Sequence, residues 1–340
     1  MTQRGISTAV VLVGGLGTRL RPLTNLLPKP LLPLLDIPLI GHQILWLARN
    51  GIQRVILAAG YKAERLRSEL LRHDWGLELT VVEEPEPLDT AGAIKFASQG
   101  LEETFLATNG DLILNPSLAD MVAAHKAAGA AATIMLRRVE DVSHYGLVLR
   151  DDTSRVIAFL EKKPEDETGQ RTVNAGVYLL EPNVLHLVPE RSSWSIERRL
   201  FPDLLASGAV IHGHLPARPY YWIDVGRLDT YRQAHRDLLA GVVDWCGPWV
   251  SEQATISPQA KLVAPVFLSG GVRVGPEAVV GPFVSLSPCV EVGEGARVED
   301  SIVWATARVG HGARVVGCVV TPEAVVPDGE SISDRIVMPK

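Results

Sequence analysis

The stretch AVVLVGGLGTRLRPLTNLLPKPLLPL, residues 9–34, joins a short apolar run to a glycine cluster and then to cations near prolines. The apolar run predicts a buried strand, and glycines after it let backbone N–H groups approach a ligand closely. Arg19 offers a planar fork to an anion, and Lys29 is a point charge between Pro28 and Pro30. Together these residues predict a strand that ends in a phosphate-binding loop.

The composition is that of an ordinary globular protein. The 340 residues are 46% hydrophobic and 21% charged with a net charge of -6, so no basic surplus favours nucleic acid binding. Cys246, Cys289 and Cys318 form no CxxC pair and have no histidine at zinc-ligand spacing. No apolar run approaches the ~20 residues of a membrane span or suits a signal peptide. We therefore expect free thiols, a cytoplasmic protein, and neither nucleic acid nor membrane as partner.

The chain divides into parts with different periodicities. Over residues 1–240 short apolar runs alternate with helical patterns, which predicts an α/β domain with a Rossmann-like, mostly parallel sheet. Ligands of such sheets bind over the carboxyl ends of the strands, where both the glycine loop and NGD at 109–111 lie. Residues 241–253 are expected to be a linker.

After Trp249 the sequence follows a six-residue period. Aliphatic residues recur at this spacing from Ile256 to Val298, each followed four places later by a second small or aliphatic residue. The register slips by one near Ser301 and then resumes at Val303. A hexapeptide period predicts a β-helix over residues 254–340, and the pattern resembles the left-handed parallel β-helix.

Three kinds of nucleotide site compete for the glycine loop. A dinucleotide site needs GxGxxG and a helix that begins at the loop, but Leu20 stands at the third glycine position and Pro22 opposes the helix. The Walker string GxxxxGK[ST] is absent. A nucleotide-sugar site, with glycines 14, 15 and 17 against phosphate oxygens, fits best.

The string GGLGTRLRPLT followed by LPKP closely resembles the nucleotidyl-transferase signature of the sugar-nucleotide pyrophosphorylases. Further motifs stand in the order of that family: EEPEPLDTAGAI at 83–94, NGD at 109–111, YG at 145–146, EKKP at 161–164, NAG at 174–176, SIE and FP within 195–202, and WIDVG at 222–226. With the hexapeptide tail the resemblance covers nearly the whole chain, and it is closest to the mannose-1-phosphate guanylyltransferases. It implies an enzyme that joins a sugar 1-phosphate to a nucleoside triphosphate and releases pyrophosphate, without a covalent enzyme intermediate.

The resemblance also implies roles for individual residues. Catalytic roles would belong to Arg19, Lys29, Asp111, Lys162 and Asp224. Asp111 and Asp224 would hold Mg²⁺, which prefers carboxylate oxygens together with substrate phosphates. The nucleotide would be bound by Gly14, Gly15, Gly17, Thr18, Glu83, Glu84, Thr90, Ala91 and Gly92, and the sugar phosphate by Gly146, Glu161, Lys162, Asn174 and Gly176. Aligning EKKP on Glu161 selects Lys162, which we prefer, whereas aligning on Pro164 selects Lys163.

The carboxylates of Glu83 and Glu84 suggest which base is bound. A carboxylate can accept both the N1–H and N2–H of guanine, whereas uracil and thymine present one N–H between two carbonyls. GTP with mannose 1-phosphate, giving GDP-mannose, is therefore our first choice. Asp89 replaces a glycine of the family's LGTAGA, and it would be tolerated at positive φ. Its charge leaves the base open, so UTP, dTTP or ATP with glucose 1-phosphate or a heptose 1-phosphate remain alternatives.

The β-helix is expected to be structural or oligomerising, which makes a homo-oligomer the expected assembly. An acyltransferase site would need a histidine base, and His311 is the only histidine after position 235. We expect removal of residues 254–340 to alter assembly more than chemistry. The alternative from another class is a non-catalytic regulatory subunit or nucleotide-sugar sensor. Such proteins typically lose the loop arginine, the PKP lysine or a metal carboxylate, all of which this chain keeps.

Overall fold

The computed structural model describes residues 5–60, 62–140, 146–160, 169, 171–244 and 249–339. By its internal contacts the chain divides into two compact units: Met1–Leu16 with Ile40–Trp222, and Gly17–Leu39 with Ile223–Lys340. The first glycines of the loop thus belong to the first unit, whereas Arg19 and Lys29 belong to the unit that contains the hexapeptide repeats. The boundaries drawn from periodicity at 240 and 254 follow the change in sequence pattern and stay a prediction.

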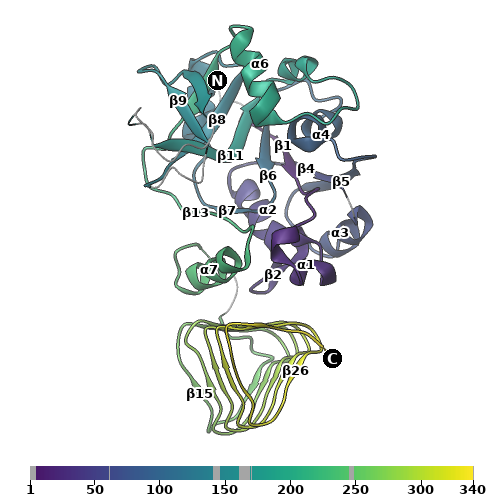
Figure 1. Cartoon of the computed structure of the whole chain (residues 1–340), viewed down its shortest axis with the longest axis vertical. Coiled ribbons are helices and arrows are strands. Elements are labelled where there is room, and N and C mark those ends of the chain that lie inside the picture. Colours follow the sequence, from purple (N-terminus) through teal and green to yellow (C-terminus); the bar gives the residue numbers. More distant parts are fainter. Residues whose placement is uncertain are drawn as a thin grey trace. The chain divides into compact units, whose positions relative to one another are not determined.

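The first unit is built on a nine-stranded mixed sheet, counted over the described residues (Figure 1). The main strand order is β10-β9-β11-β6-β1-β4-β5, with β8 on β11 and β12 on β8. The strands are β1 (Thr8–Leu12), β4 (Arg54–Ala59), β5 (Glu78–Glu83), β6 (Phe105–Asn109), β8 (Ala132–Arg138), β9 (Leu147–Arg150), β10 (Val156–Leu160), β11 (Thr172–Leu180) and β12 (Ile211–His214).

The centre of this sheet is parallel, as the apolar runs predicted. β1 pairs in parallel with both β4 and β6, in register at Val10 with Ile56 and Ala107. A strand that is apolar after its first residue, such as TAVVL, suits this position because parallel strands are covered on both faces. β11 runs antiparallel to β6, which makes the sheet mixed. The unit's longer helices are α2 (Leu39–Arg49), α3 (Ala63–Leu70), α4 (Asp89–Ala97), α5 (Ala119–Ala127) and α6 (Phe201–Ala206).

The second unit contains the parallel β-helix that the six-residue period predicted. Its described strands form three sheets of five. The first sheet contains β14 (Thr255–Ile256), β17 (Arg273–Val274), β20 (Glu291–Val292), β23 (Arg308–Val309) and β26 (Val325–Val326). The second contains β15 (Lys261–Leu262), β18 (Val279–Val280), β21 (Arg297–Glu299), β24 (Arg314–Val316) and β27 (Ser331–Ser333). The third contains β16 (Val266–Leu268), β19 (Val284–Leu286), β22 (Ile302–Val303), β25 (Val319–Val320) and β28 (Ile336–Val337).

The remaining elements of this unit come from the signature stretch and from residues after 222. They are α1 (Leu23–Leu26), β2 (Pro33–Leu34), β3 (Ile37–Pro38) and α7 (Leu228–Leu239). β2 and β3 form a small hairpin, and short 3₁₀ turns at Thr18–Leu20 and Lys29–Leu31 precede it. β13 (Trp222–Asp224) includes the last residue of the first unit.

The register slip near Ser301 is a change in coil length. Residues stacked on one another in early coils are 18 apart, as Arg273 and Glu291 are. Later stacked residues are 17 apart, such as Ser301 and Cys318. Each shortened coil therefore loses one residue at a corner, while its aliphatic side chains remain in the central stack.

Two smaller expectations concern thiols and membranes. Cys289 and Cys318 are free thiols, and Cys246 lies outside the described residues. Within the described chain, no helix has the length and apolar character to cross a membrane.

Candidate functional site

Sequence-predicted residues of the first unit gather at one edge of the sheet. β6, β1, β4 and β5 are neighbours and run parallel, so their carboxyl ends meet at the same edge. The candidates at these ends are Gly14 and Gly15 after β1, Asp111 after β6, and Glu83 and Glu84 at the end of β5. Gly14 and Gly15 are exposed, which leaves their backbone open to a ligand.

Glu84 reaches from the end of β5 to the glycine loop. A Cβ added to Gly14 would lie 2.9 Å from Glu84 Oε1, so any side chain at this position would have to displace the Glu84 carboxyl. The other oxygen, Oε2, accepts a hydrogen bond from the backbone N–H of Leu88 at 3.3 Å. Burial raises the pKa of the Glu84 carboxyl, whereas Glu83 is exposed. Of the two carboxylates, Glu84 is therefore the one fixed against the loop.

Asp89 adopts the backbone conformation that its glycine counterpart predicted. Its φ is 55°, in the left-handed region, where aspartate is one of the better tolerated residues. Its Oδ1 accepts from the backbone N–H of Thr90 at 2.6 Å, and its Oδ2 accepts from Arg198 at 3.0 Å. The negative charge of Asp89, which left the identity of the bound base undecided from the sequence, is thus paired with Arg198.

The turn at Thr90, Ala91 and Gly92 is hydrogen-bonded to the segment at the start of the SIE motif. The N–H groups of Ala91 and Gly92 donate to the carbonyl of Trp194 at 2.8 and 3.1 Å. Thr90 Oγ1 accepts from the N–H of Ile196 at 2.8 Å. These hydrogen bonds give the TAG string a structural role. A nucleotide bound at this turn would therefore contact other atoms of the three residues.

The NGD motif is held against the end of β1. The N–H of Gly110 donates to the carbonyl of Leu12 at 2.8 Å, and a Cβ here would lie 2.5 Å from Val13 Cγ1. Gln43, on α2, is buried and donates from Nε2 to Asn109 O at 2.7 Å. Asp111 therefore follows a turn that is fixed from two sides. Gln43 was not expected from the sequence, because nothing local marks a helix glutamine as a partner of a strand end.

The NAG and SIE motifs meet around Asn174. Asn174 Nδ2 donates to the hydroxyl of Tyr178 at 2.8 Å and to Glu197 Oε1 at 2.5 Å, while its Oδ1 accepts from the N–H of Gly176 at 2.8 Å. Burial raises the pKa of Tyr178, and the charges of Glu197 and Asp111 act in the same direction. Asn174, Glu197 and Asp111 thus belong to one electrostatic neighbourhood, centred on a tyrosine that sequence analysis missed.

In the second unit, Gly17 brings Lys29 against the loop. Gly17 has a φ of 59°, and a Cβ there would lie 2.9 Å from Thr24 Cγ2 and 3.1 Å from Lys29 Cβ. Thr24 Oγ1 donates to the Gly17 carbonyl at 2.9 Å. Lys29 is only 9% exposed, although Thr18 and Arg19 are exposed. Lys29 therefore packs against Gly17 and does not extend into solvent.

Arg19 and Asp224 flank the same glycine. A Cβ on Gly226 would lie 2.8 Å from Asp224 Oδ1 and 3.0 Å from Arg19 Nη2. The glycine of WIDVG thus leaves room for a carboxylate and a guanidinium side by side. Two of the residues predicted to be catalytic are brought together here, from opposite ends of the nucleotidyl-transferase motif series.

The candidates for sugar phosphate binding are only partly described. Glu161, Lys162 and Lys163 lie outside the described residues. Gly146 is exposed just before β9, and a Cβ there would lie 3.3 Å from the carbonyl of Leu160, on β10. The choice between Lys162 and Lys163 stays open.

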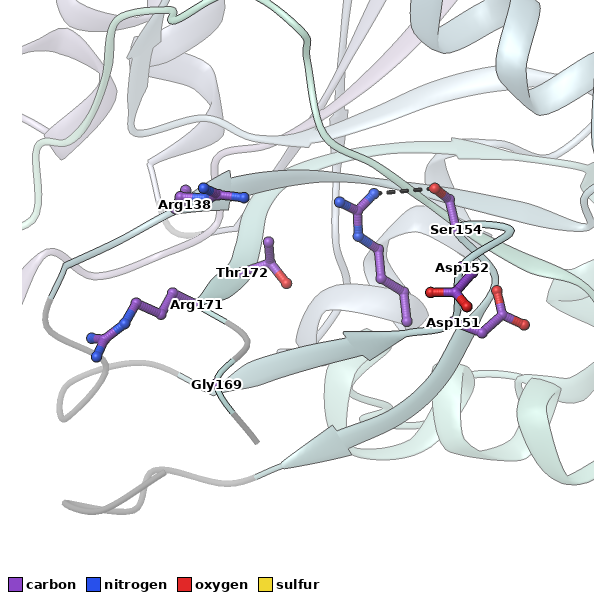
Figure 2. A pocket seen from close by; sticks show the side chains of 8 residues that line it. Arg138, Asp151, Asp152, Ser154, Gly169, Arg171 and Thr172 are labelled. Atoms are coloured by element: carbon purple, nitrogen blue, oxygen red, sulfur yellow. Dashed lines mark hydrogen bonds between the residues drawn. The ribbon is translucent and has the colours of Figure 1, made fainter. Parts of the chain in front are cut away.

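A cavity of about 460 Å³ lies at the ends of β8, β9 and β11. Figure 2 shows side chains that line it, among them Asp151 and Arg171, and Arg150 Nη1 donates to Ser154 Oγ at 3.2 Å. The lining mixes both signs of charge and contains Arg138, Arg150, Asp151, Asp152, Ser154, Gly169, Arg171 and Thr172. It includes none of the residues that the motifs selected, so cavity size alone does not locate the candidate site.

The described residues contain no group of three or more His, Cys, Asp and Glu side chains that could hold a metal ion. Asp111 and Asp224 each offer hard carboxylate oxygens. Either carboxylate suits Mg²⁺, which often takes one or two carboxylates and completes its shell with water and substrate phosphates.

Comparison with known proteins covers both parts of the chain. Residues 8–241 match the family model described as nucleotidyl transferase, and residues 250–340 match the GMPPB C-terminal domain. A mannose-1-phosphate guanylyltransferase of Mycobacterium tuberculosis is 37% identical over 305 residues, which are 87% of this chain and 82% of that protein. A mannose-1-phosphate guanyltransferase of Candida albicans is 36% identical over 313 residues, with coverage of 88% and 82%.

The chain is also similar to solved structures. The crystal structure of HddC from Yersinia pseudotuberculosis, complexed with GMP-PN, aligns with a TM-score of 0.60 and 27% identity. The alignment covers 68% of this chain and all of that one.

Proposed function

We propose, from the premise that this chain belongs to the nucleotidyl transferase family, that it joins GTP and mannose 1-phosphate to give GDP-mannose and pyrophosphate. The guanylyltransferase names of the Mycobacterium tuberculosis and Candida albicans relatives support this substrate pair. Nucleotidyl transferases of this family typically need a divalent metal, and we propose Mg²⁺.

The observation that carries the choice of GTP is the position of Glu84. Its carboxylate lies against the loop backbone at Gly14 and is partly buried. Two carboxylate oxygens accept from the adjacent N1–H and N2–H of guanine, and they repel the carbonyl groups that flank the single N–H of uracil or thymine. Desolvation strengthens this discrimination, because a mismatched polar group then keeps no water.

The reaction needs positioning and charge neutralisation more than covalent chemistry. An oxygen of the sugar phosphate attacks the α-phosphorus, a new P–O bond forms, and the α–β phosphoanhydride bond breaks to release pyrophosphate. In our proposal the loop backbone at Gly14, Gly15 and Gly17 binds phosphate oxygens, and Arg19 and Lys29 neutralise the charge on the leaving pyrophosphate. Asp111 and Asp224 would hold Mg²⁺, which supplies charge neutralisation at the phosphates when bound.

The sugar side is assigned in the same way. Asn174, Gly176 and Gly146 are proposed to surround the sugar, with Glu161 and Lys162 from the segment outside the described residues. Asn174 is fixed by its bonds to Tyr178 and Glu197, so its position does not depend on the ligand. We further propose a cytoplasmic homo-oligomer that associates through the β-helix.

The test is pyrophosphate release by the purified protein with Mg²⁺, for GTP, ATP, UTP and dTTP against mannose 1-phosphate and glucose 1-phosphate. We expect turnover with GTP and mannose 1-phosphate. Glu84→Gln should lower the preference for GTP over UTP by about 100-fold, while Glu86→Gln at an exposed neighbour should not. Preference for another nucleotide would overturn the role of Glu84. No turnover with any pair would favour the regulatory subunit or a heptose 1-phosphate.

A further inference from the structure

The β-helix is connected to the signature stretch by two successive hydrogen bonds. Trp304 Nε1, in the β-helix, donates to the hydroxyl of Tyr231 at 3.1 Å. That hydroxyl, on α7, donates in turn to the carbonyl of Pro33. Trp304 is 1% exposed and Tyr231 is not exposed at all, so water does not substitute for either partner. Pro33 lies four positions after Lys29, in the first strand of the β2–β3 hairpin.

Two further contacts hold the same hairpin. His235 Nε2, also on α7, lies 3.2 Å from the Pro33 carbonyl. Ser269 Oγ, in the β-helix, donates to Asp36 Oδ1 at 2.6 Å. Between these contacts, Leu35 is held at φ 57° with only 1% of its surface exposed. Leucine disfavours this region, so the surroundings and not the residue's own preference keep the turn in place.

α7 is itself anchored to one column of β-helix corners. Arg232 and Arg236 bind the two oxygens of Asp300 at 2.9 and 2.5 Å. Arg232 also lies 3.4 Å from Asp334, at a later corner of the same column. The Arg236 guanidinium lies 5.3 Å from the centre of the Phe283 ring. The shortened coils begin at Asp300, so the slip in the hexapeptide register coincides with the place where the helix docks.

We propose that the β-helix positions the catalytic segment, with Tyr231 as the positioning residue that links Trp304 to Pro33. Lys29–Leu31 forms the turn directly before the hairpin, and Leu39 N–H closes the far end on Leu32 O at 2.9 Å. A shift of the hairpin therefore shifts Lys29, and Lys29 packs on Gly17 next to Arg19. The inference rests on the proposed function for its effect on turnover. The inference contradicts our expectation from the sequence that removal of residues 254–340 alters assembly more than turnover.

The enzymatic test uses the full-length protein with Tyr231→Phe and Trp304→Phe. Tyr231→Phe keeps the ring and removes one hydroxyl. We expect kcat to fall about tenfold with GTP, because a displaced cation loses contact with the leaving group, while KM for the sugar phosphate stays within about twofold. Trp304→Phe should act in the same direction, and the double variant should lose no more than the more impaired single variant.

The control for a buried indole is Trp75→Phe in the first unit. Trp75 is 7% exposed and donates from Nε1 to Leu70 O at 2.8 Å, so the variant also loses one buried hydrogen bond. We expect it to lower the melting temperature as Trp304→Phe does, with kcat changed less than twofold. Equal loss of kcat in both tryptophan variants would reduce Trp304 to a stabilising residue and overturn the inference.

Amide hydrogen exchange tests the same inference without any turnover. In Tyr231→Phe and Trp304→Phe, peptides covering residues 31–39 should exchange faster by about tenfold, and in Trp75→Phe they should not. Unchanged exchange in Tyr231→Phe would overturn the positioning role even if GTP and mannose 1-phosphate are the substrates. Faster exchange in a protein that turns over neither would keep the positioning role and overturn only the substrate proposal.

Discussion

Glu84 Oε1 lies 2.9 Å from the point where a Cβ on Gly14 would stand, although β4 separates the strands that carry the two residues. The contact joins the loop that follows β1 to the carboxylate that follows β5. In our proposal the loop backbone at Gly14 and the base-recognising side chain of Glu84 are therefore in direct contact. A substitution at one should change the position of the other.

Gly14→Ala should displace Glu84 without unfolding the protein. The added methyl group meets the end of a flexible side chain, which can move at little cost. We expect the KM for GTP to rise about tenfold with the melting temperature nearly unchanged, measured by pyrophosphate release and thermal unfolding. Gly5→Ala is the control, since no described atom lies within 4 Å of its Cβ position. A wild-type KM in Gly14→Ala would contradict the contact.

Glu84 should also affect how the free energy of unfolding depends on pH. Burial raises its pKa above the ordinary value of 4.5, so the folded protein holds this proton more tightly than the unfolded chain does. The contribution of Glu84 to the free energy of unfolding is then largest below pH 4.5 and declines as the pH rises through the raised pKa. Urea unfolding at several pH values should show this decline in the wild type and lack it in Glu84→Gln. Parallel curves for the two proteins would argue against burial of the carboxyl.

Two substitutions at Asp89 separate backbone from charge. Asp89→Gly keeps the left-handed conformation without strain but loses the bond to Arg198, an exposed ion pair worth about 1 kcal/mol or less. Asp89→Ala loses the same bond and adds about 1 kcal/mol of left-handed strain. We expect the alanine variant to be the less stable of the pair in urea unfolding. The reverse order would mean that φ at this position is relaxed in solution.

Asp224→Asn tests the metal carboxylate. It keeps the side-chain shape beside Gly226 and removes one negative charge. We expect turnover with Mg²⁺ to fall at least about 100-fold while the melting temperature changes little. Asp229→Asn, an exposed carboxylate paired with Arg227 at the start of α7, serves as the control. Near-normal turnover in Asp224→Asn would remove this residue from the proposed metal site.

Local and periodic features were the ones that could be predicted from the sequence. The apolar runs predicted the parallel centre of the sheet, and the six-residue period predicted the β-helix, because both structures repeat a simple pattern of buried side chains. The motif order placed Gly14, Asp111 and Glu84 on strand ends, and parallel strands bring such ends together.

Contacts without a local signature could not be predicted. Tyr231 and Pro33 are 198 residues apart, and Gln43 and Asn109 are 66 apart, and no pattern near any of them marks the partner. The structural use of Thr90, Ala91 and Gly92 was missed for the same reason, since their partners lie beyond residue 190. The register slip was visible in the sequence, but the docking of α7 that accompanies it was not.

The stacked coils restrict how the tail can change its length during evolution. The contacts to Ser269 and Trp304 come from different coils, and successive coils stand about 4.8 Å apart. One coil inserted between them would pull the two anchors out of step by a whole strand spacing, and the hairpin at Pro33 and Asp36 could keep only one. Coils added beyond Asp334 would disturb neither. Related proteins that conserve these anchors should therefore vary in coil number on the far side of Asp334 and hold it constant between Ser269 and Trp304.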